Sequence, residues 1–175
     1  MLWFADALEA IRDFMSLGGP VLRAIAVTIF LMWVLIVERI IFFRSSMKQM
    51  SREIHDSWES RSERQSWNAK QIRELMISRF SEAANKGINV IQTLVALCPL
   101  LGLLGTVTGM ISVFQVMAVS GSGNVRAMAA GVSQATVPTM AGMVGALSGV
   151  LLITLLSRRA SHEVEFLEDS LTMDH

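Results

Sequence analysis

Charge is what residues 87–157 of this 175-residue sequence almost completely lack. No acidic residue occurs between Glu82 and Glu163, and Arg126 is the only charged residue between Lys86 and Arg158. Because about 20 uncharged apolar residues are enough to cross a bilayer as a helix, this absence predicts two membrane spans rather than a soluble domain. The spans are residues 88–119 and 127–157, and a loop at residues 120–126 joins them.

Cysteine and histidine are also scarce, and their placement argues against metal and disulfide chemistry. Cys98, the only cysteine, lies inside an apolar run, so we expect neither a disulfide nor a cysteine metal site. His55, His162 and His175 are scattered singly and lack ligand spacing. The sequence therefore predicts no metal and no cofactor.

The sequence also lacks the features of an enzyme or of a nucleic-acid-binding protein. The apolar runs offer only hydroxyl, amide and thiol groups, and neither a Walker motif nor a Rossmann glycine pattern occurs. A net charge of +0 argues against a nucleic-acid partner. We expect that the chain is not an enzyme.

Apolar residues dominate what is present. A hydrophobic content of 52% and a mean hydropathy of +0.48 predict an all-α integral membrane protein. A third span is expected at residues 20–43, with Glu38 and Arg39 as an ion pair at its interfacial end. Residues 1–19 predict an amphipathic helix on the periplasmic surface of the membrane, which ends at a break over residues 18–20.

Basic residues predict the orientation of the chain. Residues 44–87 contain nine lysines and arginines, whereas the loop at 120–126 contains Arg126 alone. Since the basic side of a membrane protein faces the cytoplasm, we place the segment 44–87 and the tail 158–175 there. The amino terminus and the loop then face the periplasm. Helical periodicity predicts a helical cytoplasmic segment, into which the two long spans extend.

Small residues recur along one face of each long span. Such stripes let helices pack closely, because packing must replace the hydrophobic drive that lipid does not supply. Three helices with these faces cannot bury them alone, so we expect an oligomer embedded in the bilayer. The packing residues are Gly102, Gly105 and Gly109 in the first long span, and Gly131, Ala135, Gly142, Gly145 and Gly149 in the second.

Polar groups gather beside these stripes. Each hydroxyl could simply bond a carbonyl of its own helix, but the concentration within residues 133–139 also suggests an ion pathway or helix contacts. Pro138 has no N–H, so the carbonyl of Gln134 loses its helical donor and the helix should kink. The candidate pathway residues are Thr106, Ser133, Gln134, Thr136, Pro138 and Thr139.

The motif GLLGTVTGM, followed by Gly131, Ala135, Thr139 and Gly142 at four-, four- and three-residue spacings, resembles the MotA/TolQ/ExbB proton-channel family. The resemblance implies a homopentameric ring around a single-span partner, with the two threonines lining the ion path. Gln134 stands where many ExbB proteins carry a glutamate. The spans then contain no titrating carboxylate or imidazole, and the working acid is expected on an ExbD-like partner with a membrane aspartate.

The length of the cytoplasmic segment distinguishes the branches of this family. Flagellar stators resembling MotA have a larger insertion than residues 44–87, so TolQ-like and ExbB-like subunits remain. The compact length and the short amino-terminal tail favour an ExbB-type subunit that acts with a TonB-like protein in a Gram-negative inner membrane. A TolQ-like envelope-maintenance subunit and a non-conducting scaffold remain alternatives. Protons are the expected coupling ion, and Na⁺ coordinated near the free Gln134 carbonyl is the alternative.

Overall fold

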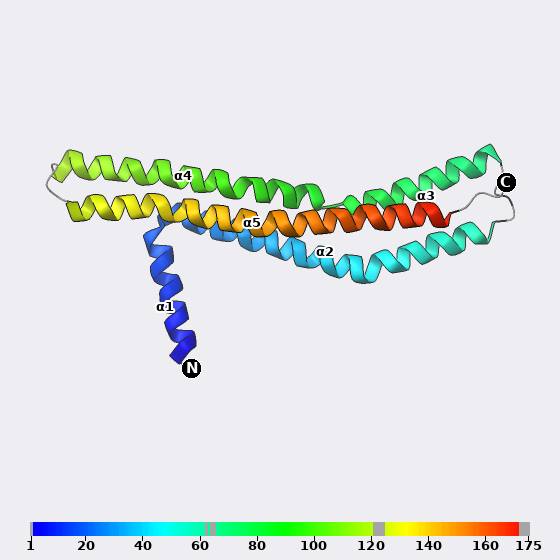
Figure 1. Ribbon diagram of the computed structural model, residues 1–175, viewed down its shortest axis with the longest axis horizontal. Helices are drawn as coiled ribbons and strands as arrows, with labels where there is room; N and C mark the ends of the chain where they lie inside the picture. Colours follow the sequence, from blue (N-terminus) through cyan, green and yellow to red (C-terminus); the bar gives the residue numbers. More distant parts are fainter. Residues whose placement is uncertain (1, 62, 64–65, 121–124, 172–175) are drawn as a thin grey trace. The chain divides into compact units, whose positions relative to one another are not determined.

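The computed structural model describes residues 2–61, 63, 66–120 and 125–171. Five helices and no strand occur in these ranges, which confirms the predicted all-α class (Figure 1). Residues 121–124 of the expected loop and residues 172–175 of the expected tail lie outside the described residues. The helices are α1 (Leu2–Leu17), α2 (Gly19–Glu59), α3 (Trp67–Asn85), α4 (Ile88–Ser120) and α5 (Val125–Ser170).

Three stretches are long and apolar enough to cross a membrane, and they confirm the three predicted spans. They are Gly19–Glu59, Trp67–Val119 and Val125–Ser170. In their most apolar windows only 28%, 28% and 33% of the residues are buried within the chain. Most apolar side chains are therefore left for contact with lipid or with other protein subunits.

Two helices continue well beyond the expected spans. The span expected at 20–43 is the first part of α2, which continues to Glu59, and residues 158–170 of the expected tail are the end of α5. Both continuations retain buried apolar residues at helical intervals, including Met47 and Leu167, and neither contains glycine or proline. By contrast, α3 and α4 are separate, because Gly87 adopts a φ of 81° that ends the helical path.

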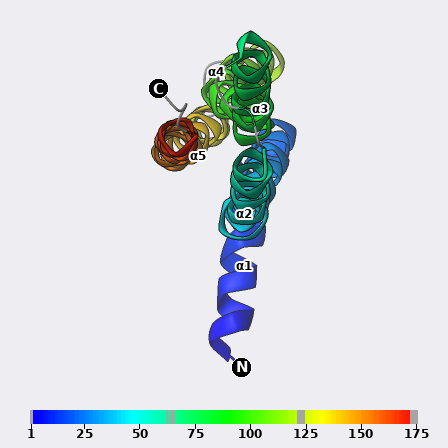
Figure 2. The ribbon, with the colours of Figure 1, turned by 90° about the vertical axis from the view of Figure 1, so that its right-hand side faces the viewer.

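The chain divides into two compact units. The first comprises Met1–Trp33 and Thr93–Val150, and the second comprises Val34–Gln92 and Leu151–His175. Within the first unit, α2, α4 and α5 run side by side, whereas α1 leaves them at the Gly18–Gly19 corner (Figures 1 and 2). A helix thus forms where the amphipathic helix was predicted, and its Ile11 and Phe14 side chains are exposed. Its position on the membrane surface stays a prediction.

The second unit is held by apolar packing and by one arginine. Its core includes Trp58 and Phe80, which are 2% and 0% exposed. The Arg73 side chain on α3 donates from Nε to the Leu171 carbonyl at 2.8 Å and from Nη2 to the Glu168 carbonyl at 2.7 Å. Because the last carbonyls of a helix have no partner within that helix, Arg73 caps the end of α5.

Candidate functional site

The backbones of α4 and α5 touch along the predicted glycine stripes. A Cβ atom on Gly102 would lie 3.0 Å from the Thr139 Cα atom, and one on Gly109 would lie 2.5 Å from the Ala135 Cα atom. A Cβ atom on Gly142 would lie 2.5 Å from the Cys98 carbonyl oxygen. At all three positions the obstacle is backbone, so only glycine permits the approach at residues 109 and 142, and a side chain at residue 102 would make a tight contact. We call this contact the α4–α5 seam.

The remaining stripe glycines also find their partners inside the chain. A side chain on Gly105 would meet the ring of Pro138, and one on Gly131 would meet Val113. On the side of α5 that faces α2, Gly145 lies against Ile29, and Gly149 lies against Met32 and Val95. The stripes are therefore filled within one protomer, so they do not themselves require the oligomer that we inferred from them.

Thr139 forms the polar contact across the seam. Its hydroxyl donates to the Gly102 carbonyl at 3.0 Å. Gly102 lies four residues before Thr106, so this carbonyl is also the helical acceptor of the Thr106 amide. The Thr106 hydroxyl itself donates to the Leu103 carbonyl at 2.7 Å. Of the two predicted threonines, only Thr139 makes a side-chain bond across the seam, whereas the Thr106 hydroxyl bonds within its own helix.

The other candidate hydroxyls lie away from the seam. Thr136 is exposed and donates to the Ser133 carbonyl of its own helix at 3.3 Å, and Ser133 is also exposed. On α4, Thr108 donates to the Leu104 and Gly105 carbonyls at 3.0 Å. These bonds stay within one helix, so the geometry separates Ser133 and Thr136 from Thr139.

The Gln134 side chain and the Pro138 ring lie in different surroundings, although the sequence analysis linked the two residues through the free Gln134 carbonyl. The Gln134 amide nitrogen lies 2.8 Å from where a Cβ atom on Gly19 would be, and Gly19 has a φ of 64°. The Gln134 side chain therefore fills the corner between α1 and α2. Pro138 is buried on Gly105 in the seam, and the proline leaves the Gln134 carbonyl without its helical donor.

Sequence reasoning missed two features. Pro99 lies inside α4 and removes the helical donor of the Val95 carbonyl, a consequence that could have been derived from the run LCPLLGL. Arg39 is only 6% exposed, and its Nε atom has no hydrogen-bond partner. The expected ion pair with Glu38 is present at 3.7 Å, but nothing in the sequence indicated that the arginine would be buried.

Comparison with known proteins decides the family. The model of the MotA/TolQ/ExbB proton channel family matches residues 38–169, about three quarters of the chain. This chain belongs to the MotA/TolQ/ExbB proton channel family. The match includes the whole of α4 and most of α5, and it leaves out α1 and the first half of α2.

Part of the chain is similar to a curated ExbB-like protein. This relative is the "Putative biopolymer transport protein ExbB-like 1" of Synechocystis sp., which is 36% identical over 84 residues. The alignment covers 46% of this chain and only 33% of that relative. No solved structure matches the chain.

Membership in the MotA/TolQ/ExbB family agrees with two broader expectations. Its members are channel or motor subunits and not enzymes, as expected from the apolar runs. The three apolar helical stretches also indicate a multi-pass membrane protein. Among the described residues, no group of three or more histidine, cysteine or acidic side chains could hold a metal ion.

Proposed function

We propose that this chain is the ring-forming subunit of an ion-driven motor in the inner membrane of a Gram-negative bacterium. Several copies, five by resemblance to the family, surround an ExbD-like single-span partner. Ion flow through the assembly does work on a TonB-like protein that energises outer-membrane transport. The observation that carries the proposal is the glycine-lined α4–α5 seam, where the Thr139 hydroxyl donates to the Gly102 carbonyl.

The proposed partner supplies the titrating group, because α4 and the membrane part of α5 contain neither a carboxylate nor an imidazole. Between Lys86 and Arg158 the sequence contains no aspartate, glutamate or histidine. Coupling to a proton gradient needs a group that binds and releases a proton in each cycle, usually a carboxylate. In our proposal the membrane aspartate of the partner is that group, and Thr106 and Thr139 provide oxygen atoms along its path.

Exposed apolar surface supports self-association. Large apolar side chains on the outer faces of α4 and α5 stay uncovered in the single chain, including Phe114 at 60% and Val144 at 68% exposure. In a membrane these faces can contact lipid, neighbouring copies or the partner helix. The seam is already filled within one protomer, so a ring would form through these outer faces.

Reconstitution tests the channel function. The chain is incorporated into vesicles alone and together with its co-encoded single-span partner, and proton flux is followed with an internal pH dye. We expect flux only when the partner is present. No flux from a correctly assembled pair would instead support the non-conducting scaffold.

Genetic complementation separates the ExbB-type role from the TolQ-type alternative. Expression with its partner in a strain lacking both ExbB and TolQ functions should restore uptake through TonB-dependent transporters. Restoration of detergent resistance without restoration of uptake would favour the TolQ-type role. The short segment between the first two spans is the feature that argues against a flagellar stator.

A further inference from the structure

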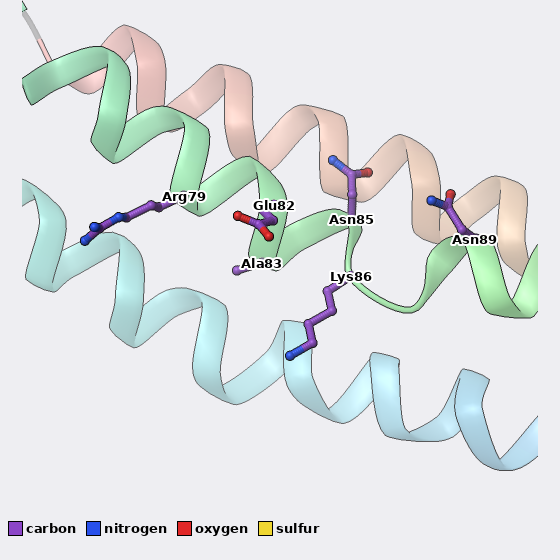
Figure 3. Close-up of a pocket in the computed structure, with 6 residues that line it drawn as sticks. All are labelled: Arg79, Glu82, Ala83, Asn85, Lys86 and Asn89. Carbon is purple, nitrogen blue, oxygen red and sulfur yellow. The ribbon is translucent and has the colours of Figure 1, made fainter. Parts of the chain in front are cut away.

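A polar hollow of about 490 Å³ lies at the junction of α3 and α4, entirely within the second unit (Figure 3). Four of its residues recur at positions i, i+3, i+4 and i+7 along α3 and the turn, so they share one face. The lining residues are Arg79, Glu82, Ala83, Asn85, Lys86 and Asn89.

Two cations in this hollow are not neutralised by the chain. Arg79 and Lys86 are exposed and extend toward the same side, with Glu82 between them (Figure 3). Within the described residues, neither cation has a carboxylate at ion-pair distance. With one carboxylate against two cations, the hollow carries a net positive charge.

A third cation lies against the same turn from the inside. The Arg39 side chain is 8% exposed, and a Cβ atom on Gly87 would lie 2.9 Å from its Nε atom, which has no hydrogen-bond partner. Its ion-pair partner Glu38 is 57% exposed, so water screens much of that attraction. The C-terminal end of α3 is partially negative and the N-terminal end of α4 is partially positive. The two helix dipoles oppose each other at this turn, so the charged side chains determine the local electrostatic potential.

The hollow lies where the chain changes from charged to apolar. Lys86 is the last charged residue before the apolar run that begins at Ile88, and the next residue, Gly87, lies against Arg39 at the interfacial end of the first expected span. We therefore place the hollow near the lipid headgroups. Basic pockets between helices at this depth are suited to phosphate-bearing headgroups. Val90, on the first turn of α4, is 54% exposed and offers an apolar surface for the acyl chains.

We propose that the α3–α4 hollow binds the headgroup of an anionic phospholipid from the leaflet that adjoins residues 44–87. Arg79 and Lys86 contact the phosphate, and Arg39 strengthens the positive potential from inside the turn. The bound anion supplies the negative charge that the chain lacks at this position. The proposal concerns lipid binding and does not depend on the coupling ion or on the outer-membrane system.

Native mass spectrometry of the full-length protein in detergent tests this site. The probes are phosphatidylglycerol and phosphatidylcholine with identical acyl chains, each titrated against wild type, R79Q/K86Q and the control K48Q/R52Q. The control removes two exposed cations of α2 that do not line the hollow. A thermal melt of each variant checks that the fold is retained.

We expect wild type to prefer phosphatidylglycerol. Each cation near the membrane surface contributes roughly fivefold in binding, so R79Q/K86Q should lose about 25-fold, whereas the control should keep the preference. Equal binding of the two lipids by wild type would overturn the proposal, as would equal losses in variant and control. Excess inorganic phosphate forms the last arm of the experiment. If phosphatidylglycerol stays bound in the presence of excess phosphate, the result supports a lipid site. If phosphate displaces the lipid, the result overturns the proposal in favour of a site for small anions.

Discussion

The Thr139 hydroxyl donates to the Gly102 carbonyl at 3.0 Å, and this bond joins α5 to α4. The residue that family resemblance assigns to the ion path is therefore also a contact between two spans. A hydroxyl that donates to a carbonyl still has lone pairs that can accept. The same group can hold the seam together and face an ion or a partner's carboxylic acid.

Thr139→Val should abolish partner-dependent proton flux. Valine keeps the shape of threonine but removes the hydroxyl, and an interhelical hydrogen bond in a membrane contributes only about 0.6 kcal/mol. Assembly should survive that loss. Proton flux in vesicles and the amount of partner co-purified are measured together, with Thr108→Val as control because its bonds stay within α4. Normal flux through Thr139→Val would remove the threonine from the mechanism.

Gly142→Ala should destabilise the first unit much more than Gly145→Ala does. The new methyl group on residue 142 meets the Cys98 carbonyl at 2.5 Å, whereas on residue 145 it meets the flexible end of Ile29. Overpacking against backbone costs about 1–3 kcal/mol, and a side-chain end can move away. Thermal unfolding in detergent measures the difference. Equal melting temperatures for the two variants would show that the seam is not closely packed there.

Glu38→Gln should leave coupling nearly unchanged. The Glu38 carboxylate is 57% exposed and lies at the end of the span beside Arg39, so it does not offer a buried titrating site. If the proposed partner is present, replacing its membrane aspartate by asparagine should eliminate flux, because in our proposal that group alone carries the proton. Loss of flux in Glu38→Gln with intact assembly would place the working acid in this chain.

Arg73→Ala should loosen the end of α5. Its two bonds to the Glu168 and Leu171 carbonyls would disappear, and a hydrogen bond made by a charged group contributes about 1.5–3 kcal/mol before solvent screening reduces it. Hydrogen exchange over residues 165–171 should accelerate about tenfold. Lys70→Ala on the same helix serves as control. Unchanged exchange in Arg73→Ala would mean that packing alone holds the helix end.

The coupling ion can be determined with the assembled complex. Protons are expected, so uptake should persist in sodium-free medium while the proton gradient is maintained. The free Gln134 carbonyl near Pro138 is the site at which Na⁺ would be expected to bind. If sodium removal stops uptake and its return restores it, Na⁺ is the coupling ion.

The spans were predictable because a charge-free run is a local property of the sequence. The glycine stripes and the pair Thr106 and Thr139 were equally visible, since their positions follow from helical spacing. The contacts of these residues were not predictable. Only the three-dimensional arrangement shows that the Gly102 carbonyl accepts from Thr139 and that the stripes are filled within one chain.

Arg39 shows the other limit of sequence reasoning. An arginine beside a glutamate at the end of a span is typical of an exposed interfacial pair, yet Arg39 is buried and Glu38 is exposed. The cause is the α3–α4 turn, in which Gly87 adopts a positive φ and leaves space for the guanidinium group. A contact between residues 48 positions apart depends on tertiary packing, which no local pattern encodes.

Cys98 gives the chain a built-in chemical reporter. It is the only cysteine, it is 0% exposed, and its carbonyl oxygen lies against Gly142 at one end of the seam. A buried thiol can be alkylated only when the packing around it opens. The rate at which a membrane-permeant maleimide modifies the native protein therefore measures how often the packing around Cys98 opens during turnover. If the seam moves as the motor works, the modification rate will rise with ion flow, without any engineered label.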